Sequence, residues 1–368
     1  PQCVERVLHP LGRLAALPGH GGDHALPGGR GRRPGQRRDP PGEPPQEQGL
    51  IKLNTNENPY PPSPRVIEAI KEALVGDRLR KYPEPTGRHF RLTAARVLGV
   101  DPEGILVGNG SDELLTILVR ALVPDGGTLA APTPSYLLYA TLAAIQGARL
   151  AAVPFSSDWR LDPRTVPLAA HLTIIPNPNS PSGTLIPPEE LASWPTPLVM
   201  DEAYVDFASA NGLGLLSRSP RLIVTRSMSK SYGLAGMRFG FAVADPRVIH
   251  ELLKVKDSYN CDALSQVAAA AALEDQAYFQ ATRQRILATR ARLESLLMEL
   301  GFEVTPSQAN FVWSQHPARP AWSIFEGLRE RRILVRLMDY GGFGSGLRIS
   351  VGTEEETEAL VAVLRELV

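Results

Sequence analysis

Short apolar runs alternate with amphipathic stretches over the middle of this chain. Two of the amphipathic stretches have a clear helical period, Asp112–Leu122 and Ser135–Gln146. The apolar runs are rich in β-branched residues and predict seven strands, at Ile105–Val107, Thr128–Ala131, Arg149–Val153, Leu172–Ile175, Leu198–Met200, Leu222–Thr225 and Phe239–Val243. Strands separated by helices predict an α/β fold, with a seven-stranded, mostly parallel sheet flanked by helices on both faces.

The pattern changes after about residue 262. A long helical stretch at Ala263–Leu300 precedes short strands around Phe302–Trp313 and Leu347–Val351, and Glu354–Leu367 is typical of a last helix. We therefore predict three folded parts: an N-terminal arm at 51–78 that joins a smaller domain, a large domain at 79–261, and the smaller α+β domain at 262–368.

Residues 1–50 differ in composition from the rest of the chain. They contain ten Gly, nine Pro, seven Arg and no Lys, without apolar periodicity. Nothing in them follows the pattern of a signal peptide. Such a segment buries too little apolar surface to offset the entropy lost on ordering. We predict that it is mostly disordered and that the folded protein begins near Ile51.

Composition and charge exclude several classes of function. Apolar residues make up 43% of the chain and charged residues 21%, as in globular proteins. The formal net charge is zero, which argues against a nucleic-acid partner. No apolar run approaches the ~20 residues that a membrane span needs. Cys3 and Cys261 form neither a disulfide framework nor a metal motif, so we expect a cytoplasmic protein without a metal.

Lys230 is the first candidate for chemistry. It lies in the run Ser227–Arg238, where Ser229 and Ser231 flank it and a glycine-broken turn precedes the arginine. A lysine amine can condense with an aldehyde to a Schiff base, while hydroxyls and a guanidinium hold a phosphate beside it. The run therefore suits an aldehyde cofactor that carries a phosphate. Taken alone, however, a solvated loop is the more common explanation of such a run.

A second motif, Gly108-Asn109-Gly110-Ser111-Asp112-Glu113, follows a predicted strand and opens a predicted helix. Glycines allow the backbone to turn tightly, and the free N–H groups at a helix start can bind an anion. The motif can thus form a phosphate cradle. By itself it is explained more simply by an ordinary helix cap at Ser111 or Asp112.

Two further polar segments follow predicted strands, where α/β sheets bind their ligands. In the segment 201–204, the Asp201 carboxylate can pair with a pyridinium nitrogen, and Tyr204 can donate to a 3-oxygen on the ring. The segment 176–183 brings amides and hydroxyls to the same edge. The alternatives are an acidic pair for Mg²⁺ or a helix cap in the first segment, and a turn-rich loop in the second.

Together, and in this order, these motifs resemble the fold-type I pyridoxal-phosphate aminotransferases of class II. The closest likeness is to the histidinol-phosphate aminotransferase family. The distinguishing block is the N-terminal stretch Lys52–Tyr60. Three shorter blocks add to it, at Lys81–Pro85, Gln308–Phe311 and Leu347–Gly352. The resemblance extends from about Lys52 to the C-terminus.

The resemblance implies pyridoxal 5′-phosphate as the cofactor, bound in the large domain. Lys230 would form the Schiff base with it and later move a proton. Asp201 would contact the pyridine nitrogen and Tyr204 the 3-oxygen, while Tyr136 would stack on the ring. The phosphate would be held by the helix start together with nearby hydroxyls and a cation, namely Ser111, Asp112, Glu113, Ser227, Ser229 and Arg238.

The resemblance also implies a homodimer, because Tyr82 in family members reaches the cofactor phosphate of the neighbouring subunit. Tyr60, Arg336 and Arg348 fall on substrate-binding positions. Arg348 could bind the phosphate of histidinol phosphate and the α-carboxylate of glutamate in turn, since a guanidinium matches either anion. Arg336 also ends a strand-like run, where pairing with a surface acid is an alternative.

One position departs from the family pattern. The family's oxygen-binding asparagine usually stands immediately before the proline of an Asn-Pro-Thr-Gly stretch. Here Ser180 occupies that position and Asn179 lies one residue earlier. Either Asn179 serves after a small backbone shift, or the 3-oxygen relies more on Tyr204. Our prediction is Asn179.

The implied activity is a ping-pong transamination in histidine biosynthesis. It interconverts L-histidinol phosphate and 2-oxoglutarate with imidazole-acetol phosphate and L-glutamate. An aromatic amino-acid aminotransferase would share every cofactor residue, and so would a decarboxylase of a phosphorylated amino acid. A non-catalytic cofactor-binding regulator would need an added DNA-binding module, and residues 1–50 show no helix-turn-helix pattern.

Overall fold

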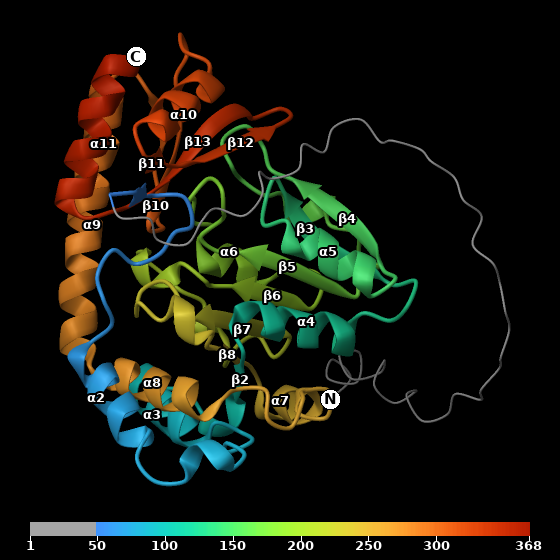
Figure 1. The fold of residues 1–368 in the computed structure, drawn as a ribbon. Coiled ribbons are helices and arrows are strands. Elements are labelled where there is room, and N and C mark those ends of the chain that lie inside the picture. Colours follow the sequence, from blue (N-terminus) through green and yellow to red (C-terminus); the bar gives the residue numbers. More distant parts are fainter. Residues whose placement is uncertain (1–48) are drawn as a thin grey trace, which may run out of the picture.

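A seven-stranded sheet forms the centre of the molecule (Figure 1). The computed structural model describes residues 49–368, so the segment predicted to be disordered lies outside the described residues except at its end. Across the sheet the strands follow the order β2 (Ile105–Gly108), β8 (Gly240–Val243), β7 (Leu222–Ser227), β6 (Leu198–Asp201), β5 (Leu172–Pro176), β3 (Thr128–Thr133) and β4 (Arg149–Pro154). All seven strands that the sequence predicts are present in this sheet.

The sheet is mostly parallel, as predicted. Only β8 runs opposite to its neighbours β2 and β7, while the other paired strands are parallel. Asp201 at the end of β6 pairs in register with Pro176 of β5 and Thr225 of β7. The carboxyl ends of neighbouring strands therefore meet at one edge, where polar segments follow them.

Successive side chains of a strand point to opposite faces, and both faces of the sheet are buried except at the edge strand β4, most of whose residues are exposed. On one face Val199 and Ile223 pack with α4 (Ser111–Leu122), α5 (Leu138–Ile145) and α7 (Pro246–Leu252). On the other face Met200 and Val224 pack with residues that include Trp194 and those of α6 (Pro188–Ala192). This two-sided burial explains the continuous apolar runs in the sequence.

A separate core lies beside β2 and β8. It joins α2 (Pro64–Ala73), α3 (Arg88–Leu98) and α8 (Ala263–Glu274), and Phe90 packs there against Phe239 and Phe241. The three helices lie together at the base of the view in Figure 1. Helix α8 thus packs with N-terminal elements, and the domain boundary expected at residue 261 stays a prediction.

The C-terminal part is built around a second, antiparallel sheet. Its order is β12 (Arg336–Tyr340), β13 (Gly344–Ser350), β10 (Phe311–Gln315) and β9 (Glu303–Thr305). The helices α9 (Gln276–Glu299), α10 (Ala321–Glu330) and α11 (Glu354–Leu367) share its core. The short strand β1 (Ile51–Lys52) pairs with β11 (Ile333–Leu334), which ties the N-terminal segment to this part.

Three local expectations differ from the structure. The helix predicted from Ser135 starts at Leu138, which leaves Ser135 and Tyr136 in a loop. The predicted helix Ala263–Leu300 is two helices, because Asp275 ends α8 and caps α9 by accepting a hydrogen bond from the Tyr278 amide at 3.3 Å. Neither α10 nor β12 was predicted; the half-buried residues of the edge strand β12 give only a weak apolar pattern.

Within residues 49–368, none of the helices is both long enough and apolar enough to cross a membrane.

Candidate active site

A cavity of about 480 Å³ opens at the carboxyl edge of the large sheet, facing β12 and β13. It brings together most of the residues that the sequence singled out: Ser111, Asp112, Tyr136, Asp201, Tyr204, Ser227, Ser229, Lys230, Arg238, Arg336 and Arg348. A larger groove of about 860 Å³ lies elsewhere, beside Trp159 and Thr305, and contains none of them. The chemistry therefore belongs to the smaller cavity.

One end of the cavity is built to hold an anion. Helix α4 begins at Ser111 without a side-chain cap, so the N–H groups of its first turn are open to a ligand. Gly110 precedes it with φ +80°, and a Cβ there would lie 2.8 Å from Arg238 Nη2. The positive φ favours glycine at this position, and a Cβ there would push the guanidinium away from the helix start. The hydroxyls of Ser227 and Ser229 line the same cavity.

The carboxylate of Asp112 orients two neighbours of this anion site. Its Oδ2 lies 3.6 Å from Arg238 Nη2. Its Oδ1 accepts a hydrogen bond of 3.3 Å from the Tyr136 hydroxyl. Burial and the charge of Asp112 raise the pKa of Tyr136, which keeps this phenol protonated as a donor. Asp112 therefore sets the side chains around the phosphate position instead of contacting an anion itself.

Lys230 lies in the loop between β7 and β8 and presents its amine to the cavity. The amine donates a hydrogen bond of 3.2 Å to the Thr55 carbonyl and lies 5.8 Å from the centroid of the Tyr204 ring. A backbone carbonyl holds the amine in place without forming an ion pair with it. The amine is thus positioned for condensation with an aldehyde, as the sequence predicts.

Asp201 is a buried carboxylate with both oxygens occupied. Its side chain closes β6 and is 4% exposed. Oδ2 accepts a hydrogen bond of 2.8 Å from the Tyr139 hydroxyl, and Oδ1 accepts one of 3.2 Å from Thr225 Oγ1. Burial raises the pKa of Asp201 to about 6, although the two hydroxyl donors oppose this shift. A cationic ring nitrogen would stabilise the charged form.

The N-terminal segment closes the cavity beside Tyr204. Asn56, with a left-handed φ of 56°, donates from Nδ2 to the Tyr204 hydroxyl at 3.0 Å. The backbone N–H of Asn56 donates to Ser350 Oγ at 2.8 Å, and Asn310 Nδ2 donates to the backbone carbonyl of Asn56 at 3.0 Å. Three sequence blocks that carry the family resemblance therefore meet in one hydrogen-bonded junction.

Two guanidiniums from the small sheet form the other polar wall. Arg336 and Arg348 are paired residues of β12 and β13. Arg348 donates from Nη1 to Ser180 Oγ at 3.0 Å and from Nη2 to the Asn54 carbonyl at 2.9 Å, while its buried Nε lacks a partner among the described residues. Arg336 opens β12 and does not end a strand-like run, contrary to expectation. Two guanidiniums on adjacent strands, with Arg348 Nε still able to donate, suit a carboxylate or a phosphate.

The structure does not bring Asn179 or the Glu113 side chain to the cavity. Asn179 is 1% exposed, and its amide donates to Ser182 Oγ at 2.9 Å within its own turn. Ser180 lines the cavity instead. The Glu113 carboxylate accepts hydrogen bonds from the Asn109 amide at 2.5 Å and from Asn260 Nδ2 at 2.6 Å. Only the backbone of Glu113 therefore belongs to the helix start.

Tyr60 and Tyr82 also lie outside the cavity of their own chain. Tyr60 is buried beneath Arg285, whose guanidinium carbon lies 3.9 Å from the ring centroid. Tyr82 is 81% exposed and stacks on Tyr259 with ring centroids 4.4 Å apart. Within one subunit neither side chain contacts the candidate site.

Several site residues were missed by sequence reasoning. Tyr139 lies three positions after Tyr136, a helical spacing that could have been noticed. Thr225 and Ser135 carried no signal, because a lone hydroxyl at a strand end is common. Asn56 lies within the resemblance block but received no role.

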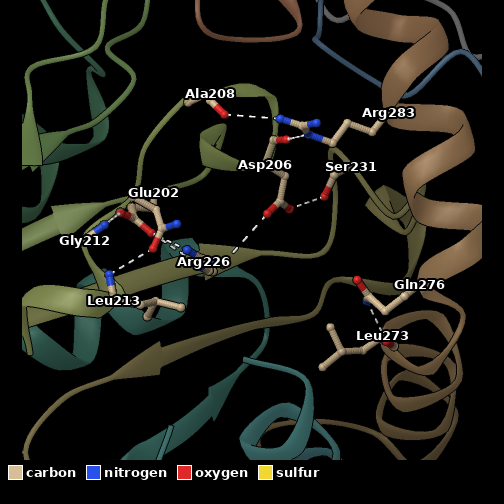
Figure 2. Close-up of polar contacts among 11 residues, drawn as sticks. Glu202, Asp206, Ala208, Gly212, Leu213, Arg226, Ser231, Leu273, Gln276 and Arg283 are labelled. Carbon is tan, nitrogen blue, oxygen red and sulfur yellow. Dashed lines mark hydrogen bonds and ion pairs between the residues drawn. The ribbon is translucent and has the colours of Figure 1, made fainter. Parts of the chain in front are cut away.

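Figure 2 shows a polar cluster around Arg226 and Asp206, whose members do not line the cavity. Glu202 Oε2 accepts from Arg226 Nε at 3.0 Å and from Nη2 at 2.9 Å, and both residues are buried. Arg226 Nη1 also lies 3.9 Å from Asp206 Oδ1, and the Asp206 carboxylate accepts a hydrogen bond from Ser231. Arg283 of α9 donates to the carbonyls of Asp206 and Ala208.

Three members of this cluster adjoin a cavity residue in the sequence. Glu202 follows Asp201, Arg226 precedes Ser227 and Ser231 follows Lys230. At the ends of β6 and β7, adjacent residues point in opposite directions, so Asp201 and Ser227 face the cavity while Glu202 and Arg226 face the cluster. The cluster therefore joins the three segments that carry the carboxylate, the hydroxyl and the amine.

The donor set fits a cofactor that carries a phosphate, a basic ring nitrogen and an aldehyde. The open helix start and Arg238 suit the phosphate, Asp201 suits the ring nitrogen, and Lys230 suits the aldehyde. Two buried hydroxyls of cavity-lining residues, Ser135 Oγ and Thr55 Oγ1, have no hydrogen-bond partner among the described residues. Such unpaired buried groups are expected where a ligand supplies the partner.

Comparisons with known proteins agree with this chemistry. The model of the aminotransferase class I and II family matches residues 48–364. A histidinol-phosphate aminotransferase of Rhodopirellula baltica is 49% identical over 332 residues, which cover 88% of this chain and 91% of that protein. The enzyme of the same name from Syntrophotalea carbinolica is 47% identical, covering 88% of this chain and 94% of its own.

A solved structure supports the same conclusion. The histidinol-phosphate aminotransferase of Sinorhizobium meliloti, in complex with pyridoxal 5′-phosphate, aligns with a TM-score of 0.80 and 30% identity, over 86% of this chain and 92% of that one. The predicted fold-type I architecture is thereby confirmed. The protein belongs to the class I and II aminotransferases and, among them, to the histidinol-phosphate aminotransferase family.

Proposed function

We propose that this protein is a pyridoxal-phosphate-dependent aminotransferase that exchanges the amino group between L-histidinol phosphate and 2-oxoglutarate. The observation that carries the proposal is one cavity that holds the Lys230 amine, the buried Asp201 carboxylate and an open helix start. Relatives of that name at 49% and 47% identity support the choice of substrate. The reaction would serve histidine biosynthesis, and a cytoplasmic location stays a prediction.

The cofactor would be held at its two polar ends. The first turn of α4 at Ser111, the hydroxyls of Ser227 and Ser229, and Arg238 would bind the phosphate. Asp201 would pair with the ring nitrogen. When bound, pyridoxal phosphate supplies an aldehyde for the lysine amine and a ring that accepts an electron pair.

Tyr204 and Tyr136 would contact the ring between those ends. The Tyr204 hydroxyl already accepts from Asn56, so its own proton is free to reach the 3-oxygen. Tyr136 lines the cavity on its Asp112 side and offers an aromatic face. Ser180, and not Asn179, lines the cavity near this position, which leaves Tyr204 as the better-supported donor to the 3-oxygen.

Lys230 would move the proton in the chemical step. Its Nζ would take the proton from the substrate carbon that bears the amino group. The hydrogen bond to the Thr55 carbonyl fixes the amine at 3.2 Å from a neutral group. Tyr204 forms one wall beside the amine, with 5.8 Å between Nζ and the ring centroid.

Arg348 and Arg336 would bind the anionic group of each substrate in turn. Histidinol phosphate presents a phosphate where glutamate presents its α-carboxylate, and a guanidinium matches both. In a ping-pong reaction the two substrates occupy the site at different times, so one pair of arginines suffices. The hydroxyl of Ser180 and the Asn54 carbonyl hold Arg348 in position for both.

A homodimer is part of the proposal. Tyr82 is exposed, and Leu79 and Val75 near it are also exposed apolar side chains. Such a surface is typical of an interface. We expect Tyr82 to reach the cofactor phosphate of a second copy, as the family resemblance implies.

A single-turnover assay tests the activity. The cofactor-loaded protein would be mixed separately with histidinol phosphate, glutamate or phenylalanine, while the absorbance of the bound cofactor is followed. We expect fast conversion with the first two and conversion slower by orders of magnitude with phenylalanine. Comparable conversion by phenylalanine would identify an aromatic aminotransferase. Release of CO₂ from a phosphorylated amino acid, added in a separate reaction, would identify a decarboxylase.

A further inference from the structure

Tyr139 contacts Asp201 but has no role in the proposed function so far. It lies in the first turn of α5 and is 1% exposed. Its ring meets that of Tyr136 edge to face, with centroids 5.7 Å apart. Its hydroxyl donates to Asp201 Oδ2 at 2.8 Å, and both residues of this hydrogen bond are buried. The buried Tyr139 phenol therefore uses the Asp201 carboxylate as its hydrogen-bond acceptor.

This hydrogen bond completes a two-sided clamp on the carboxylate. The Thr225 hydroxyl, from the neighbouring strand β7, donates to the other oxygen, Oδ1, at 3.2 Å. Helix α5 supplies one donor and the sheet supplies the other, so the carboxylate plane cannot rotate without breaking a bond. Hydrogen bonds to a charged acceptor are shorter and stronger than those between neutral groups.

The clamp also affects the charge of Asp201. Burial raises the pKa of Asp201, and the nearby Asp112 carboxylate adds to the shift, whereas the hydroxyls of Tyr139 and Thr225 lower it. The phenols of Tyr136 and Tyr204 face the same pocket. Burial and Asp112 favour the neutral acid, whereas the two hydroxyl donors, together with the backbone N–H of Ala203, favour the carboxylate.

We propose that Tyr139 is a positioning residue, which orients the Asp201 carboxylate for the ring nitrogen of the cofactor and stabilises its charged form. The inference rests on the proposed function, because it needs a cationic ring nitrogen as the group that Asp201 meets. Tyr139 acts through Asp201, and its hydroxyl proton is already used in the 2.8 Å bond.

The test is the affinity for pyridoxal phosphate, measured by titrating the full-length, cofactor-free protein. Tyr139→Phe removes one hydroxyl and keeps the buried ring. We expect the dissociation constant to rise roughly tenfold at neutral pH, the usual effect of losing a hydrogen bond to a charged group. The ratio to the wild type should grow as the pH is lowered from about 8 to about 6, because Asp201 without its donor binds a proton more readily.

A double-mutant cycle separates this role from simple packing. In an Asp201→Asn background, Tyr139→Phe should have little further effect on the dissociation constant, since there is no carboxylate left to stabilise. Additive losses in the cycle would contradict the proposal. The proposal would also be contradicted if Tyr139→Phe weakened the affinity for pyridoxal phosphate by the same factor at every pH.

Two variants of Thr225 test the same inference even if the Tyr139→Phe protein does not fold. Thr225→Val should weaken cofactor binding with the same pH dependence, and Thr225→Ser should restore it. Wild-type affinity in both Tyr139→Phe and Thr225→Val would overturn the inference. Failure of the wild-type protein to bind pyridoxal phosphate at all would instead overturn the proposed function.

Discussion

At the scale of single residues, the site combines two groups with opposite needs. The Lys230 amine must reach its reacting group without a competing acid, and it rests on a backbone carbonyl at 3.2 Å. The Asp201 carboxylate must be buried and still charged, and two hydroxyls serve that purpose. Sequence motifs identify both residues, because Asp201 directly follows a predicted strand and Lys230 lies in a distinctive run between two predicted strands. Their hydrogen-bond partners come from other segments.

Lys230→Ala should abolish transamination, because the amine both attaches the cofactor and moves the proton. We expect the turnover to fall by a factor on the order of 10³ or more, measured with glutamate and histidinol phosphate. Lys254→Ala serves as the matched control, since that lysine is exposed and pairs with Glu251 on the surface. Substantial turnover in the Lys230 variant would contradict the assignment.

Asp201 should make the stability of the cofactor-free protein depend on pH. Its pKa is raised from 3.8 to about 6 on folding, so the folded state binds a proton more tightly than the unfolded chain. Below pH 3.8 both states are protonated and this stabilisation is fully present. It is lost as the pH rises through about 6, which lowers the free energy of unfolding by about 3 kcal/mol.

Asp201→Asn removes this titration, since an amide stays neutral. The difference in free energy of unfolding between variant and wild type should therefore grow in favour of the variant from about pH 4 to about pH 7. Urea denaturation of both cofactor-free proteins measures it. Parallel stability curves over this range would show that Asp201 is not the titrating group.

Arg348→Ala should raise the KM for both the amino donor and the acceptor, because one guanidinium binds both anions. We expect a rise of about tenfold to a hundredfold for each, the usual loss for a charged hydrogen-bond pair. Arg329→Ala on α10 is a control, since Arg329 is exposed and pairs with Glu326. A rise for only one substrate would disprove the shared anion site.

At the scale of elements, the site depends on how strand ends are joined. The neighbouring strands β6 and β7 carry Asp201 and Ser227 at their ends, and Lys230 lies in the loop after β7. Each of these residues is adjacent in the sequence to a member of the buried cluster of Glu202, Arg226, Asp206 and Ser231 (Figure 2). The sequence predicts both strands. It does not predict that a buried arginine joins their ends, because sheet order is not encoded in a local pattern.

Arg226→Met should destabilise the protein strongly. It leaves the buried Glu202 carboxylate without its partner, and an unpaired buried charge costs about 3 to 5 kcal/mol. Urea denaturation should show this loss. The control is Arg164→Ala, which breaks the exposed pair with Asp162 and should leave the midpoint unchanged. Equal effects of the two variants would rule out a structural role for the buried pair.

At the scale of the whole molecule, the cavity lies between two sheets that fold from different parts of the chain. The large sheet supplies the cofactor residues, and β12 and β13 supply Arg336 and Arg348. The N-terminal segment at 54–57 closes the junction between them. Tyr82 remains outside, exposed on the surface of its own chain.

Mixed dimers test whether Tyr82 acts across an interface. Tyr82→Ala subunits and Lys230→Ala subunits should each have low activity alone. A hybrid dimer would contain one site with both residues intact, so activity should reappear after the two proteins are unfolded together and refolded. If Tyr82 acts within its own chain, mixing will restore nothing.

The sequence by itself determined the seven strands, the class of fold and the residues with the most distinctive chemistry. Apolar periodicity is a local property, and the distinctive residues around Ser111, Asp201 and Lys230 lie next to predicted strands or between them in the chain. For the same reason the last helix, Glu354–Leu367, was predicted at its observed bounds.

Only the tertiary structure decided which residues support these groups. Tyr139 and Thr225 lie 62 and 24 residues from Asp201 in the chain, and they meet it because of helix packing and strand order. The same is true of Ser180, which accepts a hydrogen bond from Arg348 across 168 residues of the chain. Contacts of this kind depend on how distant elements pack, and no local pattern carries that information.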